Sequence, residues 1–160
     1  MEDFAFILEK TGEENGPNYK YEGTYYDIAK AIRNYIPAWM VAMEAFFKLL
    51  VFNYIYGNGD AHLKNFSVTL QGDDYVLAPA YDLLNTRIHI NGPDLALEGG
   101  LSYDIPKSEV YEHTGHPCRK DFENFAKNVG LKEKRYKAIL EHFMAIPSKT
   151  KELKIGRAHV

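Results

Sequence analysis

The feature that most constrains the fold is an almost wholly apolar stretch at residues 37–56. Pro37 suits the first turn of a helix, and Gly57 suits the position just beyond a helix C-terminus. Only one carboxamide and two charged side chains, Glu44 and Lys48, interrupt the apolar run. A helix that is apolar on nearly all sides is usually buried. The stretch therefore predicts a central helix around which the rest of the domain packs.

A helix of this length, about 30 Å, could also cross a bilayer. Glu44 and Lys48 argue against that, since they lie near its middle at the i,i+4 spacing of a surface ion pair. The net charge of −3 gives no general attraction to nucleic acid or membranes. The single cysteine excludes an intrachain disulfide, and the acidic first three residues show no signal peptide. We therefore expect a cytoplasmic protein that does not bind membranes.

The other elements are predicted from capping signals and hydrophobic periodicity. They are a helix from Thr24 to about Tyr35, strands at 66–70 and 75–78 joined by a turn, and helices at about 120–129 and 132–145. Residues 11–23 and 86–106 are predicted to be loops, and residues 1–9 are too short a pattern to classify. The fold class is thus mainly α, a helical bundle around a buried central helix with a small β-hairpin.

The loop that follows the central helix, Gly57 to Asn65, carries several groups that are able to do chemistry. Asp60, His62 and Lys64 lie within it, and two glycines before them allow a sharp turn. The apolar helix before the loop and the hairpin after it would hold these groups rigidly, as a catalytic loop requires. A plain polar turn has the same composition, so the loop alone does not decide the function.

The spacing of three side chains matches what phosphoryl transfer needs. In protein kinases a base Asp precedes a metal-binding Asn by five positions, and a second metal-binding Asp follows a hairpin. Here Asp60 precedes Asn65 by five, and Asp82 comes directly after the predicted hairpin. Asn and Asp offer the hard oxygen ligands that Mg²⁺ prefers. Two simpler interpretations stay open: Asp82 could make an Asx turn, and His62 could bond the loop backbone instead of phosphate.

The residues 57–67, Gly-Asn-Gly-Asp-Ala-His-Leu-Lys-Asn-Phe-Ser, and 80–83, Ala-Tyr-Asp-Leu, resemble the catalytic and metal-binding motifs of HipA-type kinases. These are bacterial serine/threonine-protein kinase toxins of toxin–antitoxin modules. The resemblance implies ATP and Mg²⁺ as cofactors and a protein-kinase-like C-lobe as the fold. It also implies the roles of individual residues, namely Asp60 as catalytic base, Asn65 and Asp82 as Mg²⁺ ligands, His62 and Lys64 near the phosphates, and Tyr81 beside the nucleotide.

The resemblance covers most of the chain, which we interpret as one domain, residues 1–147, followed by a basic tail, residues 148–160. For residues 155–160 the interpretation stays open between native chain and foreign sequence. The sequence contains no glycine-rich phosphate loop and no strand lysine paired with a helix glutamate. Those parts belong to a kinase N-lobe, so we expect this C-lobe to be inactive without one.

The resemblance also implies partners. They are a cytoplasmic protein substrate, with glutamyl-tRNA synthetase the best-known target type, and a helix-turn-helix antitoxin through which alone DNA would be contacted. Two alternatives remain. Gly59, Asp60, His62 and Asn65 also fit the Gly-Asp-x-His-x-x-Asn pattern of aminoglycoside and choline kinases. The chain could otherwise be a catalytically incomplete lobe that only binds an antitoxin.

A second cluster, His113, His116 and Cys118, has the side chains of a zinc site. A closed structural site needs four ligands, and no fourth stands nearby at a recognisable spacing. An exposed loop is therefore the expected structure there.

Overall fold

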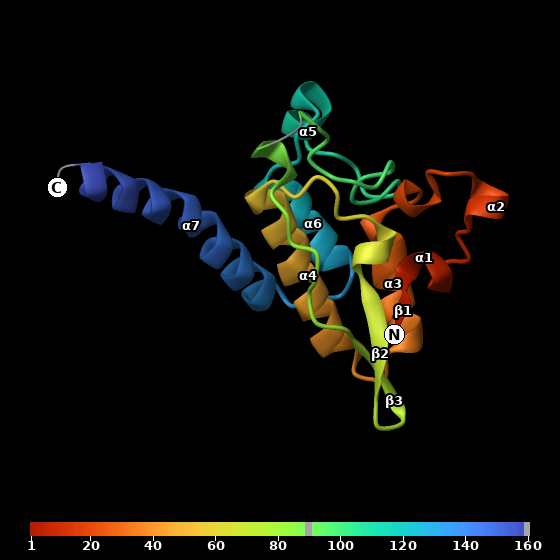
Figure 1. The fold of residues 1–160 in the computed structure, drawn as a ribbon. Coiled ribbons are helices and arrows are strands. Elements are labelled where there is room, and N and C mark those ends of the chain that lie inside the picture. The colour runs from red at the N-terminus through yellow and green to blue at the C-terminus, as the bar shows by residue number, and fades with distance from the viewer. Residues whose placement is uncertain (89–90, 159–160) are drawn as a thin grey trace.

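The computed structural model describes residues 1–88 and 91–158, the last thirteen of them as backbone only. Figure 1 shows a helical body with one small sheet and a long C-terminal helix that projects from it. The elements in chain order are β1 (Glu2–Asp3), α1 (Phe4–Ile7), α2 (Gly12–Asn15), η1 (Tyr19–Tyr21), α3 (Tyr25–Tyr35), α4 (Trp39–Tyr56), η2 (Leu63–Asn65), β2 (Ser67–Gln71), β3 (Asp74–Leu77), η3 (Thr86–Ile88), α5 (Glu109–Thr114), α6 (Arg119–Asn128) and α7 (Glu133–Ala158). The predicted fold class, mainly α with a small hairpin, is confirmed.

Helix α4 lies at the centre of the fold, in contact with α3, α7 and β3. One of its faces carries core side chains that are almost fully buried, among them Phe46, Phe47 and Leu50. Its other face is not covered, since Met40 is 59% and Val41 74% exposed. The prediction of a central helix is confirmed, but burial on all sides is wrong, because an exposed stripe with Val41, Lys48 and Tyr56 runs along one face of α4. By length and composition α4 could cross a membrane, yet it supplies the core of the fold.

The C-terminal end of α4 follows the sequence signal, but the expected start is wrong. The helix begins at Trp39 with Ala38 as its N-cap, so Pro37 precedes the helix and does not lie in its first turn. Gly57 adopts a left-handed conformation with φ 73°, and its N–H donates to the carbonyls of Asn53 and Tyr54. Glu44 and Lys48 form the predicted i,i+4 ion pair at 3.4 Å, and Arg135 from α7 also pairs with Glu44. The helix therefore stops at the residue that opens the polar loop.

The hairpin is confirmed and extended. Strands β2 and β3 pair antiparallel with Val68 opposite Leu77, and β1 adds a third antiparallel strand with Glu2 opposite Val68. The side chain of Asp3 accepts a hydrogen bond from the N–H of Phe6 and so caps α1. Residues 1–9, which periodicity could not classify, thus form the sheet edge and the first helix.

The segment before α3 is more ordered than predicted. Residues 11–23 contain the short helices α2 and η1 as well as loop. The predicted cap of α3 is confirmed: the N–H of Asp27 donates to Oγ1 of Thr24, and the N–H of Thr24 donates to the carboxylate of Asp27. This reciprocal pair fixes where α3 begins.

The predicted end of the last helix near Ala145 is wrong. Helix α7 runs to Ala158 through Pro147 without a break in its assignment. Proline removes one backbone bond and usually kinks or ends a helix. Figure 1 shows α7 continuing as one long helix that projects from the body of the domain.

One buried carboxylate joins α5 to α6. Asp121 is 5% exposed, and its oxygens accept hydrogen bonds from the N–H groups of Ser108 and Cys118, both at 2.8 Å, and from the Ser108 hydroxyl at 2.7 Å. Burial raises the pKa of Asp121, but these hydrogen bonds outweigh it and hold the pKa below its usual value. The carboxylate form is therefore part of the folded structure.

We expect Asp121→Ala to lower the free energy of unfolding by about 2–3 kcal/mol, because it leaves buried N–H groups without an acceptor. The folded pKa lies below the unfolded one, so the wild-type advantage is present above about pH 4 and is lost as pH falls through the folded pKa. Urea unfolding at a series of pH values measures both effects. Asp73→Ala, in the exposed hairpin turn, is the matched control, and an equal loss in both variants would contradict the account.

Candidate functional site

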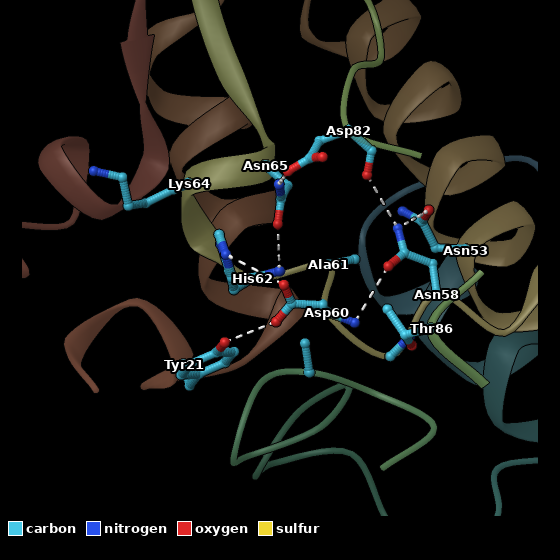
Figure 2. Close-up of polar contacts among 12 residues, drawn as sticks. Tyr21, Asn53, Asn58, Asp60, Ala61, His62, Lys64, Asn65, Asp82 and Thr86 are labelled. Carbon is cyan, nitrogen blue, oxygen red and sulfur yellow. Dashed lines mark hydrogen bonds and ion pairs between the residues drawn. The ribbon is translucent and has the colours of Figure 1, made fainter. Parts of the chain in front are cut away.

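The polar loop begins at the C-terminus of α4 and ends in η2, directly before β2. Asn58 is the residue that anchors it. Its side chain is 5% exposed, its Nδ2 donates to Oδ1 of Asn53 at 3.0 Å, and its Oδ1 accepts from the N–H of Asp60 at 3.2 Å. Nδ2 also lies 3.5 Å from the carbonyl oxygen of Asp82. One buried carboxamide thus connects α4, the Asp60 backbone and the Asp82 backbone (Figure 2).

Asp60 presents its carboxylate to solvent, with 52% of the side chain exposed. Oδ1 accepts a hydrogen bond from the Tyr21 hydroxyl at 2.7 Å. Oδ2 lies 3.9 Å from Nε2 of His62. A carboxylate that is exposed and held from one side is able to accept a hydrogen bond from an incoming hydroxyl.

His62 lies beneath this carboxylate and is 7% exposed. Burial is the main cause that lowers the pKa of His62, and the positive charge of Lys20 adds to it, while Asp60 and Asp82 act in the opposite direction. Its Nδ1 is buried without a hydrogen-bond partner among the described residues. The ring packs edge-on against Tyr21, with centroids 5.3 Å apart. At neutral pH we therefore expect a neutral imidazole that supports the loop.

Asn65 and Asp82 meet at the site although they are 17 positions apart in the sequence. Nδ2 of Asn65 donates to Oδ2 of Asp82 at 3.0 Å, and Oδ1 of Asn65 accepts from the N–H of His62 at 3.0 Å. Asp82 has φ 57°, a conformation that is uncommon outside glycine. Figure 2 shows Asp60, Asn65 and Asp82 around one space. The site therefore contains the three side chains that the sequence spacing singled out.

The Asn65–Asp82 pair fits Mg²⁺ as a partial ligand set. Within the described residues, no group of three or more His, Cys, Asp or Glu side chains could hold a metal. A carboxylate with an oxygen to spare and a carboxamide oxygen with a second lone pair are hard ligands. Mg²⁺ commonly takes only one or two carboxylates and completes its shell with water and substrate phosphates. The pair therefore suits a metal that arrives with a phosphorylated ligand.

Lys64 and Tyr81 lie differently from the other predicted residues. Nζ of Lys64 is 3.7 Å from Oδ2 of Asp3 and 3.5 Å from the Tyr19 hydroxyl, and Figure 2 shows its side chain directed away from Asp82. The Tyr81 hydroxyl donates to the carbonyl of Lys64 at 2.6 Å and lies 2.5 Å from Oγ of Ser67. In this structure the Tyr81 hydroxyl is therefore bonded to the backbone of η2. Nζ of Lys64 does not reach Asn65 and Asp82.

The segment after Asp82 contacts the polar loop through the side chain of Thr86. The N–H of Gly59 donates to Oγ1 of Thr86 at 2.9 Å, and that hydroxyl lies 3.2 Å from the carbonyl of Gly57. On the other side, the buried Tyr25 hydroxyl donates to the carbonyl of Ala61 at 2.8 Å. These contacts fix both flanks of Asp60.

Gly59 leaves no room for a side chain. A Cβ there would lie 2.5 Å from the carbonyl oxygen of Pro93 and 3.2 Å from Oγ1 of Thr86. We expect Gly59→Ala to push the loop away from the Pro93 backbone and to lower the free energy of unfolding by about 1–3 kcal/mol. Gly92→Ala is the matched control, because its Cβ would meet nothing within 4 Å. Thermal unfolding of both variants measures the difference, and equal stability would contradict this close packing.

The side chains of the suspected zinc cluster are engaged elsewhere. His113 Nδ1 contacts the carbonyl of Glu109, and His116 pairs with Asp94. Cys118 is the N-cap residue of α6. The expected exposed loop is therefore only part of the structure here, because His113 lies in α5 and Cys118 caps α6, and only His116 lies in the loop between these helices.

Sequence reasoning missed Tyr21, Asn58 and Thr86 as parts of the site. Tyr21 is 39 residues from Asp60 along the chain and lies in a segment expected to be an exposed loop. Thr86 follows Asp82 in a stretch without periodicity. Asn58 stands inside the polar loop and could have been weighed, because a buried carboxamide needs several partners.

Comparison with known proteins gives one family and several relatives. Residues 1–150 match the family described as the HipA-like C-terminal domain. A protein of Sinorhizobium fredii named "Putative kinase Y4dM" is 39% identical over 98 residues, which is 60% of this chain and 22% of that protein. A Haemophilus influenzae protein named "Putative kinase" is 29% identical over 135 residues, or 78% of this chain and 38% of that protein.

A solved structure shares the fold. It is the Shewanella oneidensis toxin–antitoxin complex of HipA, HipB and operator DNA, with a TM-score of 0.59 and 17% identity. The match covers 91% of this chain and 33% of the matched chain. This chain thus spans between about a fifth and two fifths of the length of the proteins it matches.

Proposed function

The chain belongs to the HipA-like C-terminal domain family, and on that premise we propose that it is the C-terminal lobe of an ATP- and Mg²⁺-dependent serine/threonine-protein kinase. The relatives named as kinases support the general class. One observation carries the proposal. The side chains of Asn65 and Asp82 are joined by a hydrogen bond, Nδ2 to Oδ2 at 3.0 Å, beside the exposed carboxylate of Asp60.

In the proposed reaction Asp60 accepts a hydrogen bond from the acceptor hydroxyl and orients it toward the γ-phosphorus of ATP. As the new oxygen–phosphorus bond forms and the bond to the bridging oxygen of ADP breaks, Asp60 takes the hydroxyl proton. Asn65 and Asp82 would hold Mg²⁺, which when bound offsets negative charge on the phosphates. Asn58 holds the base Asp60 and the metal-binding Asp82 at a fixed separation through its contacts to their backbones.

His62 and Lys64 have different parts in this proposal. His62 is buried under Asp60, so its role is to support the carboxylate rather than to contact phosphate. Lys64 would have to leave its contacts with Asp3 and Tyr19 to approach a phosphate. Because its side chain is exposed, that rearrangement disturbs no packed core, and closure of an ATP-bearing lobe over the site would supply the attraction.

The partner that we propose is a helix-turn-helix antitoxin, with DNA contacted only through it. The support is the matched Shewanella HipA, whose structure is a complex with HipB and operator DNA. The fold is shared over 91% of this chain. A toxin–antitoxin kinase whose partner binds DNA is therefore the setting that we propose for this lobe.

The acceptor class separates this proposal from its enzyme alternative. We would measure transfer of labelled γ-phosphate by the complete protein to bacterial cytoplasmic protein, with glutamyl-tRNA synthetase as the first candidate, and to choline and aminoglycosides. We expect labelled phosphoserine in protein and no labelled small molecule. Transfer to choline or an aminoglycoside alone would replace the protein-kinase function with a small-molecule one.

A further inference from the structure

The Tyr21 hydroxyl is the group that holds the Asp60 carboxylate. It reaches the site from η1, and it donates to Oδ1 of Asp60 at 2.7 Å (Figure 2). Its backbone is fixed on two sides, since its N–H donates to the carbonyl of Asn18 at 2.9 Å and its carbonyl accepts from the N–H of Glu98 at 2.8 Å. The hydroxyl is therefore presented from a rigid segment and not from a free loop.

We propose that Tyr21 is a positioning residue that fixes the rotamer of Asp60, so that Oδ2 faces the acceptor hydroxyl. The inference rests on the proposed function. Oδ1 accepts the hydrogen bond from Tyr21, while within the described part of the chain the polar group nearest to Oδ2 is Nε2 of His62, at 3.9 Å. An acceptor hydroxyl therefore approaches the oxygen that is left free.

Other features of Tyr21 support a donating role. Burial and the hydrogen bond to Asp60 raise the pKa of Tyr21 to about 12, so the hydroxyl keeps its proton at neutral pH. The ring packs edge-on against His62, and Nζ of Lys20 lies 5.1 Å from the ring centroid. Tyr21→Phe removes the donor and leaves the ring to make the same packing contacts.

The alternative is that Tyr21 merely completes the packing of η1. If Tyr21 acts by positioning Asp60, its effect on the transfer rate should depend on the presence of Asp60. If Asp60 is changed to Asn, removing the Tyr21 hydroxyl should cause little further loss of transfer, because residues that act as a unit are not additive. A residue that stabilises the fold independently would lower the activity by the same factor in both backgrounds.

The test measures single-turnover phosphate transfer by the complete protein in four forms: wild type, Tyr21→Phe, Asp60→Asn and the double variant. We expect Tyr21→Phe to lower the rate by about 10- to 100-fold, the scale of a misplaced reacting group, with the KM for Mg–ATP and the melting temperature unchanged. The double variant should match Asp60→Asn. Tyr35→Phe, whose side chain is 57% exposed, is the control and should behave as the wild type.

A second measurement does not depend on transfer. Three-bond couplings in the isotopically labelled chain report the Asp60 rotamer, which should be single in the wild type and averaged in Tyr21→Phe. If the wild type transfers no phosphate but the Asp60 rotamer still changes from single to averaged in Tyr21→Phe, the proposed function is wrong while the positioning contact is confirmed. Unchanged couplings, an unchanged rate in Tyr21→Phe, an additive double variant, or phosphate found on Tyr21 itself would overturn the inference.

Discussion

In the complete protein, Asp60→Asn is expected to lower phosphate transfer by about 100- to 10,000-fold, the range found for a lost general base. Asparagine has nearly the size of aspartate and can still accept from the Tyr21 hydroxyl. It is not able to take a proton from the acceptor. The side chain is 52% exposed, so the free energy of unfolding should stay within about 1 kcal/mol of wild type.

Single-turnover kinetics at saturating Mg–ATP measures this loss without interference from product release. Asp73→Asn, in the exposed hairpin turn, is the charge-matched control and should transfer phosphate at the wild-type rate. If Asp60→Asn kept the wild-type rate while folding normally, Asp60 could not be the base.

Asp82→Asn is expected to lower transfer by at least about 100-fold at low Mg²⁺, because a metal ion can supply several kcal/mol of charge stabilisation in the transition state. Asparagine tolerates the left-handed backbone that Asp82 adopts, with φ 57°. The substitution therefore changes the charge at the site without straining the segment. Higher Mg²⁺ should recover part of the rate, since the remaining ligands still bind metal weakly.

Transfer rates over a Mg²⁺ titration give the apparent metal affinity of each form. We expect the titration midpoint to move to higher Mg²⁺ in Asp82→Asn and to stay in place in Asp73→Asn. A rate that falls equally at every Mg²⁺ concentration would point to a role for Asp82 other than metal binding.

The main elements were predictable because local signals mark their ends. Gly57 stops α4 in a left-handed conformation, and Thr24 with Asp27 forms the cap that starts α3. The alternating apolar pattern placed β2 and β3 close to their observed bounds. These signals act within a few residues along the chain and depend little on the rest of the fold.

Elements that depend on distant partners were not predictable. Strand β1 has two residues and exists because β2 offers it an edge. The exposed side of α4 depends on which of its faces α3, α7 and β3 cover, which composition does not report. Reasoning from a single proline also gave the wrong end for the last helix, since α7 continues through Pro147.

The residues of the candidate site likewise fall into those that local sequence signals indicate and those that depend on distant partners. Asp60, Asn65 and Asp82 were singled out by their spacing, and the structure brings all three to one place, while their roles stay a prediction. The direction of the Lys64 side chain depends on Asp3 and Tyr19, which lie far away in the sequence. The contact from Tyr21 likewise requires η1 to fold back over the loop, and no local pattern indicates that.

The most direct test of the central claim is transfer of labelled γ-phosphate by the purified chain, alone and joined to a HipA-type N-lobe. In the proposed function the chain supplies a base and metal ligands, whereas the parts that hold ATP phosphates in kinases lie in the other lobe. We predict no measurable transfer by the chain alone and Mg²⁺-dependent transfer to protein serine once the N-lobe is present. Strong transfer by the chain alone, or none from a joined protein that binds ATP, would contradict the account.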